Sequence, residues 1–251
     1  MSVEETLQRA QQGDINAMLA IADDYAASSE IEQALTWFEQ AIAVGEKGSE
    51  QMQHALSMAM YSYTIKVIDD VETASWNDGF IHSSKLFSYA TELLSYENSQ
   101  EKKIELVQKG RFALYNAAIC QHAVDEDSDA LKTLGIVELN EPRATLLELL
   151  CRASLEAENT YHYLKIYETE DLRDAFKNTQ CWREELMLAM GFFRLSLCYR
   201  LGMGVKPNIN KAYDILQKGL SLATFNETRR CFSDELNHYK RSLFGGYSYI
   251  E

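Results

Sequence analysis

Residues that interrupt helices are scarce in this sequence. The 251 residues include two prolines, Pro142 and Pro207, and 12 glycines. No stretch shows the sustained alternation of Val, Ile or Thr with polar residues that is typical of exposed strands. Hydrophobic residues make up 46% of the chain and charged residues 25%, as in ordinary folded proteins. The sequence therefore predicts an all-α protein.

Positive charge is also in short supply. Lys and Arg total 24 against 38 Asp and Glu, which gives a formal net charge of −14. Because binding to nucleic-acid phosphates requires clustered Lys and Arg, this balance argues against a nucleic-acid partner. The excess of carboxylates favours a basic partner, although the same charge also serves to keep a helical surface soluble.

Signals for export and membrane insertion are absent as well. The first residues, MSVEETLQRAQQGD, lack the basic and apolar regions of a signal peptide, and no apolar run approaches the length of a membrane span. The cysteines are odd in number, scattered and without a CxxC pair, which favours a reducing compartment. We therefore expect a cytoplasmic protein without membrane contact. The five cysteines are Cys120, Cys151, Cys181, Cys198 and Cys231.

Apolar residues recur at helical spacing along nearly the whole chain. Asp14 is expected to cap one helix, and Asn77, Asp78 and Gly79 are expected to form a turn. Pro142 is expected to open one long helix that ends near Tyr167. The predicted helices cover 3–11, 15–27, 31–43, 50–67, 80–96, 100–123, a short segment after Asp127 or Asp129, 142–167, 172–177, a pair on either side of 202–208 that ends at 223, and 225–243.

Two helical pairs in the chain match each other. The segments 10–45 and 192–223 share a pattern of large and small residues, the last four of which are spaced by 3, 4 and 4 residues in both copies. Their links differ in length by four residues, and the second link contains Gly202, Gly204 and Pro207. The corresponding residues are Tyr25, Ala34, Trp37, Ala41 and Gly45 in the first copy and Tyr199, Ala212, Ile215, Gly219 and Ala223 in the second.

On these residues the chain resembles the Sel-one-like and tetratricopeptide repeat superfamily. The resemblance covers roughly 70 residues. It implies an α/α superhelical solenoid over a single domain, 1–251, with a C-terminal capping helix, because terminal repeats need a polar outer face. The implied units are 10–45, 50–96, 100–139, 142–178 and 181–224, followed by a cap and tail at 225–251.

The resemblance further implies a concave surface that holds a protein or peptide. Exposed tyrosines on the first helices of pairs make good contact anchors, although packing is the commoner role for any single one. Tetratricopeptide domains that clamp a terminal carboxylate use Lys and Asn on these helices, and here the matching surface offers Asn16 and no Lys. The candidate partner-binding residues are Asn16, Tyr61, Tyr63, Tyr115, Tyr161 and Tyr163.

No motif predicts a catalytic, cofactor or metal site. The acidic run at 125–129 lacks the glycine and the closing carboxylate of a calcium loop. Glu158 and His162 alone would bind a metal weakly, and Cys181 has no accompanying histidine signature. The favoured function is therefore a non-enzymatic interaction module. The alternatives are an enzyme with its site in the groove, a sensory receptor for a small peptide, and a structural homodimer.

The last residues, KRSLFGGYSYIE, do not fit the repeat pattern. Tyr247 to Ile250 alternate apolar and polar residues like a short strand. We expect this tail to fold back on the terminal helix, with insertion into another protomer as the alternative. Tyr247 and Tyr249 are the candidate contacts, and homo-oligomerisation would use the tail or the C-terminal helix.

Overall fold

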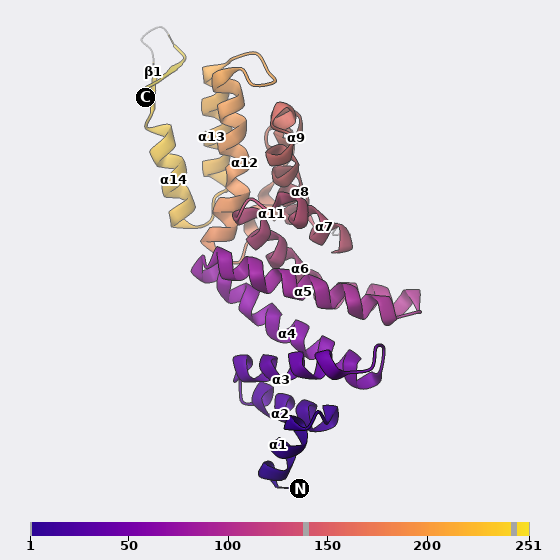
Figure 1. Ribbon diagram of the computed structural model, residues 1–251. Coiled ribbons are helices and arrows are strands. Elements are labelled where there is room, and N and C mark those ends of the chain that lie inside the picture. The colour runs from indigo at the N-terminus through magenta and orange to yellow at the C-terminus, as the bar shows by residue number, and fades with distance from the viewer. Residues whose placement is uncertain (1, 138–140, 242–244, 251) are drawn as a thin grey trace. The chain divides into compact units, whose positions relative to one another are not determined.

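The computed structural model is built almost entirely of helices (Figure 1). It describes residues 2–137, 141–241 and 245–250. These residues fall into two compact units, unit 1 at Met1–Cys120 and unit 2 at Gln121–Glu251. The all-α prediction is confirmed, and the only strands in the described ranges form a short C-terminal hairpin.

Most of the predicted helices lie where the periodicity places them. Asp14 caps the second helix, with its side chain accepting hydrogen bonds from the backbone of Asn16 and Ala17. In chain order the elements are α1 (Val3–Gln11), α2 (Ile15–Ala27), α3 (Ile31–Val44), α4 (Glu50–Thr73), α5 (Trp76–Tyr96), α6 (Gln100–Ala123), α7 (Asp127–Val137), α8 (Pro142–Leu155), the 3₁₀ turn η1 (Ala157–Asn159), α9 (Thr160–Leu164), α10 (Ile166–Thr169), α11 (Arg173–Lys177), α12 (Trp182–Leu201), α13 (Ile209–Leu222), α14 (Asn226–Leu236), β1 (Tyr239–Arg241) and β2 (Tyr247–Tyr249).

The expected turn at residues 77–79 is wrong, because these residues lie inside α5. The chain reverses earlier, at Ala74, whose left-handed backbone ends α4. Gly79 serves close approach and not a turn: a Cβ there would lie 2.6 Å from the sulfur of Cys120 on α6. The sequence therefore has a glycine at position 79 because two helices pack tightly there, and not because the chain turns.

The single long helix expected from Pro142 to Tyr167 is also wrong. α8 ends at Leu155, and Glu156 leaves the helical conformation. Thr160 stabilises the break, since its hydroxyl donates to the carbonyls of Ala153 (3.1 Å) and Ala157 (2.8 Å). A side chain thus satisfies carbonyls that a continuous helix would bond internally.

Unit 1 is a succession of helices that pack in chain order. Each of α1 to α4 contacts the next helix along the chain, and α2 also contacts α4. The small residues Ala34 and Ala41 of α3 are fully buried, and so is Phe38 between them in the sequence. Side-chain caps begin three of these helices, from Ser2, Asp14 and Ser49.

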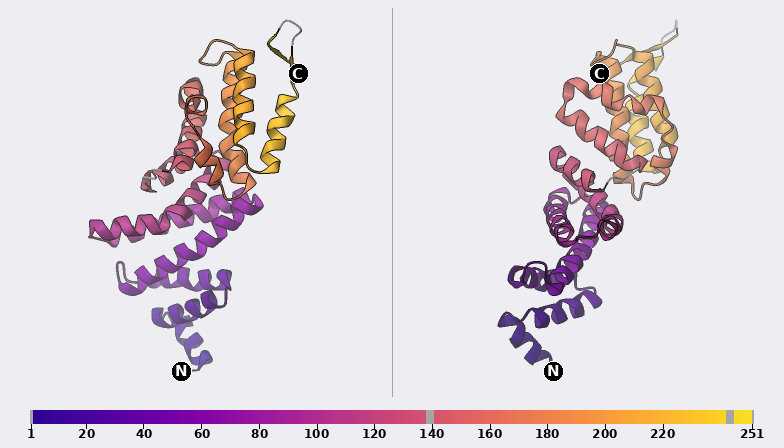
Figure 2. Two further views of the ribbon diagram at one scale, coloured as in Figure 1. Left: turned by 180° about the vertical axis from the view of Figure 1, so that it is seen from behind. Right: turned by 90° about the vertical axis from the view of Figure 1, so that its right-hand side faces the viewer.

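Unit 2 is organised around α12. This helix contacts α8, α9, α13 and α14, and Figure 2 shows α12, α13 and α14 lying side by side. Phe192 is fully buried at the centre, with its ring centroid 4.9 Å from Tyr167, 5.8 Å from Phe176 and 6.0 Å from Phe232. Gly219 of α13 lies beneath two of these rings, at a position where a Cβ would overlap the ring of Phe232.

The last predicted helix ends at Leu236 and not at Leu243. Tyr239 instead belongs to β1, which pairs antiparallel with β2 in the register Tyr239 to Tyr249 and Arg241 to Tyr247. Position 243 itself lies outside the described residues. The tail therefore folds back within its own chain, through strand pairing in addition to helix contacts.

Aromatic contacts hold this tail. Tyr247 stacks on Tyr213 of α13 with centroids 3.7 Å apart, and its backbone N–H donates to Asn210 at 2.7 Å. The guanidinium of Arg200 lies 3.7 Å from the ring centroid of Tyr249. Such cation–π and aromatic contacts contribute about 0.5–1.5 kcal/mol each.

Over the described ranges, no helix combines the length and the apolar character that crossing a bilayer requires.

Removal of residues 242–251 tests the tail. We expect the shortened chain to melt a few degrees lower, because the Tyr247 and Tyr249 contacts together contribute about 1–3 kcal/mol. Light scattering should give the same oligomeric state for both chains. A lower state in the shortened chain would mean that the tail exchanges between copies.

A pair of glycines tests the packing of unit 2. A Cβ on Gly219 would overlap the ring of Phe232, so we expect Gly219→Ala to lower the free energy of unfolding by about 1–3 kcal/mol. Gly135 in α7 has open space around its Cβ position, so Gly135→Ala should raise it by about 0.5–1 kcal/mol. Urea titration followed by circular dichroism measures both, and equal effects would contradict this packing.

Candidate functional site

Two of the candidate partner-binding residues lie at the surface of unit 1. Asn16 is exposed in the first turn of α2. Tyr61 is 59% exposed on α4. Among the described residues it is the only aromatic one that is counted with the exposed large hydrophobic side chains. Both side chains are accessible to a partner.

Two other candidates are core residues. Tyr115 is 1% exposed, which leaves its side chain no surface for the predicted partner contact. Tyr63 is also buried, and its hydroxyl donates to Glu39 at 2.9 Å. Helical spacing alone cannot distinguish these buried tyrosines from the exposed Tyr61, because the helices that pack against each other decide which face is covered.

Tyr161 and Tyr163 are partly buried and turn to different neighbours. The hydroxyl of Tyr161 lies 3.4 Å from that of Tyr199, whereas the hydroxyl of Tyr163 donates to Glu156 at 2.6 Å. Residues two apart on a helix do not share a face. The structure therefore does not bring these two rings together as one binding surface.

Glu39 joins three helices of unit 1. One of its carboxylate oxygens accepts hydrogen bonds from Tyr89 (2.8 Å), Tyr63 (2.9 Å) and Lys85 (3.1 Å). Burial by itself raises the pKa of Glu39, but the hydrogen bonds from Tyr89, Lys85 and Tyr63 outweigh it and lower the pKa below its ordinary value. The ionised carboxylate is thus a stabilising link between α3, α4 and α5.

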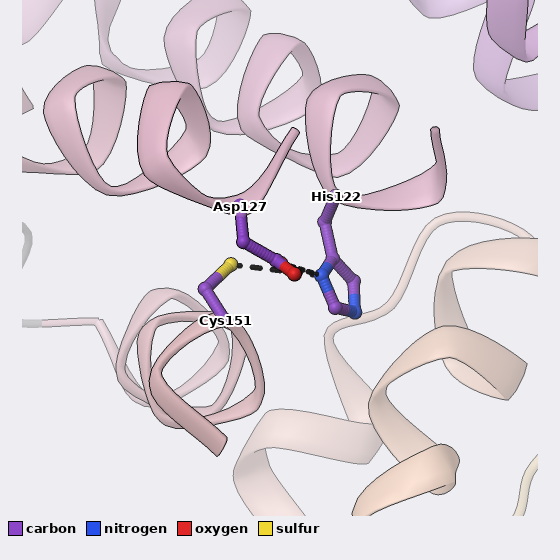
Figure 3. Close-up of side chains that lie close together, drawn as sticks. All are labelled: His122, Asp127 and Cys151. Atoms are coloured by element: carbon purple, nitrogen blue, oxygen red, sulfur yellow. Dashed lines mark hydrogen bonds and ion pairs between the residues drawn. The ribbon is translucent and has the colours of Figure 1, made fainter. Parts of the chain in front are cut away.

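In unit 2, three side chains of metal-binding type meet. The atoms that His122, Asp127 and Cys151 offer as ligands all lie within 4.8 Å of one another. Asp127 forms a hydrogen bond with Nδ1 of His122, and the sulfur of Cys151 lies 3.7 Å from the same nitrogen (Figure 3). No other such group of three or more occurs in the part of the chain that the structure describes.

The turn between α6 and α7 sets the positions of the first two residues. His122 lies in the last turn of α6 and Asp127 is the first residue of α7. Between them Asp125 adopts a left-handed backbone with φ of 63°, and the N–H of Glu126 donates to the carbonyl of Gln121 at 2.9 Å. The chain therefore reverses within three residues and turns both side chains to the same side.

Two further contacts complete this arrangement. The hydroxyl of Thr133 donates to the side chain of Gln121 at 2.8 Å, which ties α7 to α6. α8 packs against α7 and presents Cys151 from the opposite side (Figure 3). Three different helices thus each supply one side chain.

The cluster is deeply buried. Cys151 is 0% exposed, and the side chains of Asp127 and His122 are 6% and 14% exposed. Burial raises the pKa of the Cys151 thiol, and the negative charge of Asp127 raises it further. Without a cation beside it, the sulfur is therefore held as the thiol, which is a poor nucleophile.

The same residue types form the catalytic groups of cysteine hydrolases, but the geometry here differs. In such a triad the histidine uses one ring nitrogen toward the nucleophile and the other toward the carboxylate. Here both Asp127 and Cys151 face Nδ1 of His122. The arrangement fits ligands that converge on one point better than it fits a proton relay.

Sequence reasoning did not find this cluster. Asp127 belongs to the acidic run at 125–129 beside a predicted helix, and neither His122 nor Cys151 belongs to a recognised spacing. The available signal was weak: a His at the end of one predicted helix and an Asp at the start of the next. Cys151 follows 29 residues after His122, and only the packing of α8 brings it close.

Comparison with protein-family models gives no match for this chain, and comparison with curated proteins gives no significant match.

The acid stability of the protein tests the Glu39 link. Because its pKa is lowered on folding, the ionised carboxylate contributes stability above the unfolded value of about 4.5, and this is lost as the pH falls through the folded pKa. At neutral pH, Glu39→Gln should lower the free energy of unfolding by about 1–2 kcal/mol.

The difference between wild type and Glu39→Gln should then shrink below pH 4.5, measured by urea titration across the pH range. Glu30→Gln is the matched control, since the exposed Glu30 side chain makes no capping hydrogen bond. A difference that is independent of pH would contradict the role given to the charge.

Proposed function

We propose that this protein is a non-enzymatic interaction module that binds a basic segment of a partner protein on the exposed face of α4. Its helix pairs form an α/α solenoid of the Sel-one-like and tetratricopeptide type. The support for this architecture is the run of helices α1 to α5, each in contact with its successor. Stacking of that kind creates extended binding surfaces.

The observation that carries the binding proposal is a stripe along α4. Ser57, Tyr61, Ile65 and Asp69 are spaced four residues apart, share one face of the helix and are all exposed. At its centre Tyr61 is 59% and Ile65 is 37% exposed. Two large apolar side chains one turn apart, flanked by polar ones, are an anchor of the kind found at interfaces.

Charge identifies the kind of partner. Residues 1–120 contain 18 Asp and Glu against 8 Lys and Arg, whereas residues 121–251 contain 20 against 16. The excess of negative charge is thus concentrated in unit 1, which carries the stripe. Complementary charge steers association and selects among partners, so a segment rich in Lys or Arg with an apolar anchor fits this face.

The cellular setting follows from the cysteines. None of the five forms a disulfide. This favours a reducing compartment, and we place the protein and its partner in the cytoplasm.

The stripe is tested by site-specific crosslinking. A photoreactive amino acid at position 61 should capture a partner through a Lys- or Arg-rich peptide, identified by mass spectrometry. The same group at Leu201, which is 61% exposed on α12, is the matched control and should not capture that partner.

The captured peptide, made synthetically, should then bind wild type in a fluorescence anisotropy titration. Tyr61→Ala with Ile65→Ala should weaken it by tenfold or more, about 1.4 kcal/mol, because anchors at an interface dominate its affinity. Leu201→Ala should leave it unchanged. Unchanged binding by the double variant, or equal capture at both positions, would refute the proposed surface.

A further inference from the structure

We propose that His122, Asp127 and Cys151 form a binding site for one Zn²⁺ ion within unit 2. The inference is independent of the interaction surface on α4. It is based on the convergence of three unlike donor atoms at a buried point, to which each of three helices contributes one (Figure 3).

The donor set selects the class of metal. An imidazole nitrogen, a carboxylate oxygen and a thiolate sulfur are the three kinds of side-chain ligand that zinc takes. Calcium and magnesium prefer six or more oxygen ligands, so the sulfur and nitrogen exclude them. A dication also balances the two negative charges of a carboxylate and a thiolate that are otherwise costly to bury together.

The distances suit a tetrahedral ion. With Zn–N near 2.0 Å and Zn–S near 2.3 Å, two ligand atoms of one ion lie roughly 3.3–3.8 Å apart. The sulfur of Cys151 and Nδ1 of His122 lie 3.7 Å apart, within this range. His122 and Asp127 are in direct hydrogen-bond contact, which is closer, so ion entry requires the Asp127 carboxylate to rotate away and give up that bond.

The framework around the ligands is already organised. The α6–α7 turn fixes His122 and Asp127 five residues apart, and the Thr133 to Gln121 hydrogen bond holds the two helices together. Sites assembled on rigid elements lose less entropy when they bind. An ion here would therefore join the turn to α8 and close a loop of 29 residues between His122 and Cys151.

The site offers three protein ligands, one fewer than a closed structural zinc site, and it is shielded from solvent. Its sulfur is fully buried, and only the His122 side chain reaches partway to the surface. Glu148, three residues before Cys151, already pairs with Arg152 at 2.8 Å. A water molecule on the His122 side is the remaining candidate for a fourth ligand, and bound zinc would act as a clip that stabilises unit 2.

Cobalt substitution tests the site. Untagged full-length protein, stripped of metal by a chelator, is titrated with Co²⁺ under reducing conditions. We expect one equivalent to bind, with a thiolate-to-cobalt charge-transfer band and the intense visible bands of a tetrahedral ion, and one equivalent of Zn²⁺ to displace it. An octahedral spectrum, or no charge-transfer band, would overturn the proposal.

Three variants identify the ligands. Cys151→Ala should abolish the charge-transfer band, and His122→Asn and Asp127→Asn should each weaken Zn²⁺ binding by more than the ~10–100-fold that loss of an outer-shell partner costs. Cys198→Ala is the matched control, because Cys198 is equally buried on α12. Retained binding in all three variants, or loss in the control, would refute the assignment.

X-ray absorption of the zinc-loaded wild type gives an answer that depends on no variant. It should show one sulfur near 2.3 Å and the remaining ligands as nitrogen or oxygen near 2.0–2.2 Å. No sulfur, or two, would exclude this site. Zinc should also raise the melting temperature of wild type and leave that of Cys151→Ala unchanged.

Discussion

Unit 2 depends on the packing of one aromatic side chain, Phe192. Its ring contacts Tyr167, Phe176 and Phe232, which come from α10, α11 and α14. The surrounding backbone makes room for these rings at two glycines, Gly191 beneath Tyr167 and Gly219 beneath Phe232. Large rings placed over bare backbone let short helices bury enough apolar area to hold their positions around α12.

Buried carboxylates of α12 also hold unit 2 together, through hydrogen bonds to the links between helices. Glu185 of α12 is fully buried and accepts hydrogen bonds from the backbone of Thr224 (2.8 Å) and Phe225 (3.1 Å), where the chain passes from α13 to α14. Its neighbour Glu184 bonds to Arg143 at 3.0 Å and to the backbone N–H of Gln180 at 2.7 Å. These carboxylates accept hydrogen bonds from backbone amides of the links, and so they fix where the links run.

Helix positions were predictable because the signal is local. Capping by Asp14 and the spacing of the small residues Ala34, Ala41, Ala212 and Gly219 depend on neighbours within a few residues. The errors arose where distant chain decides the outcome. The sequence predicts a turn at Gly79 because only the approach of Cys120 shows its role in packing. Thr160 interrupts a helix through hydrogen bonds to carbonyls that the pattern cannot identify.

The same distinction between local signals and distant contacts applies to the candidate sites. Exposure of Tyr61 and burial of Tyr115 depend on which faces later helices cover, and both are tyrosines at helical spacing. His122 and Asp127 lie on either side of a helix boundary that the sequence does indicate. Their meeting with Cys151 depends on tertiary packing alone. A prediction of the proposed zinc site would have required the path of α8.

The order of helix contacts in unit 1 determines which helices unfold most readily. Since α1 contacts α2, α2 contacts α3 and α4, and so on to α5, a helix at the end of the series loses few interactions when it detaches. Opening of such a terminal helix does not require the whole unit to unfold. Amide hydrogens of α1 will thus exchange with solvent faster than those of α4, which forms a gradient of protection along the chain.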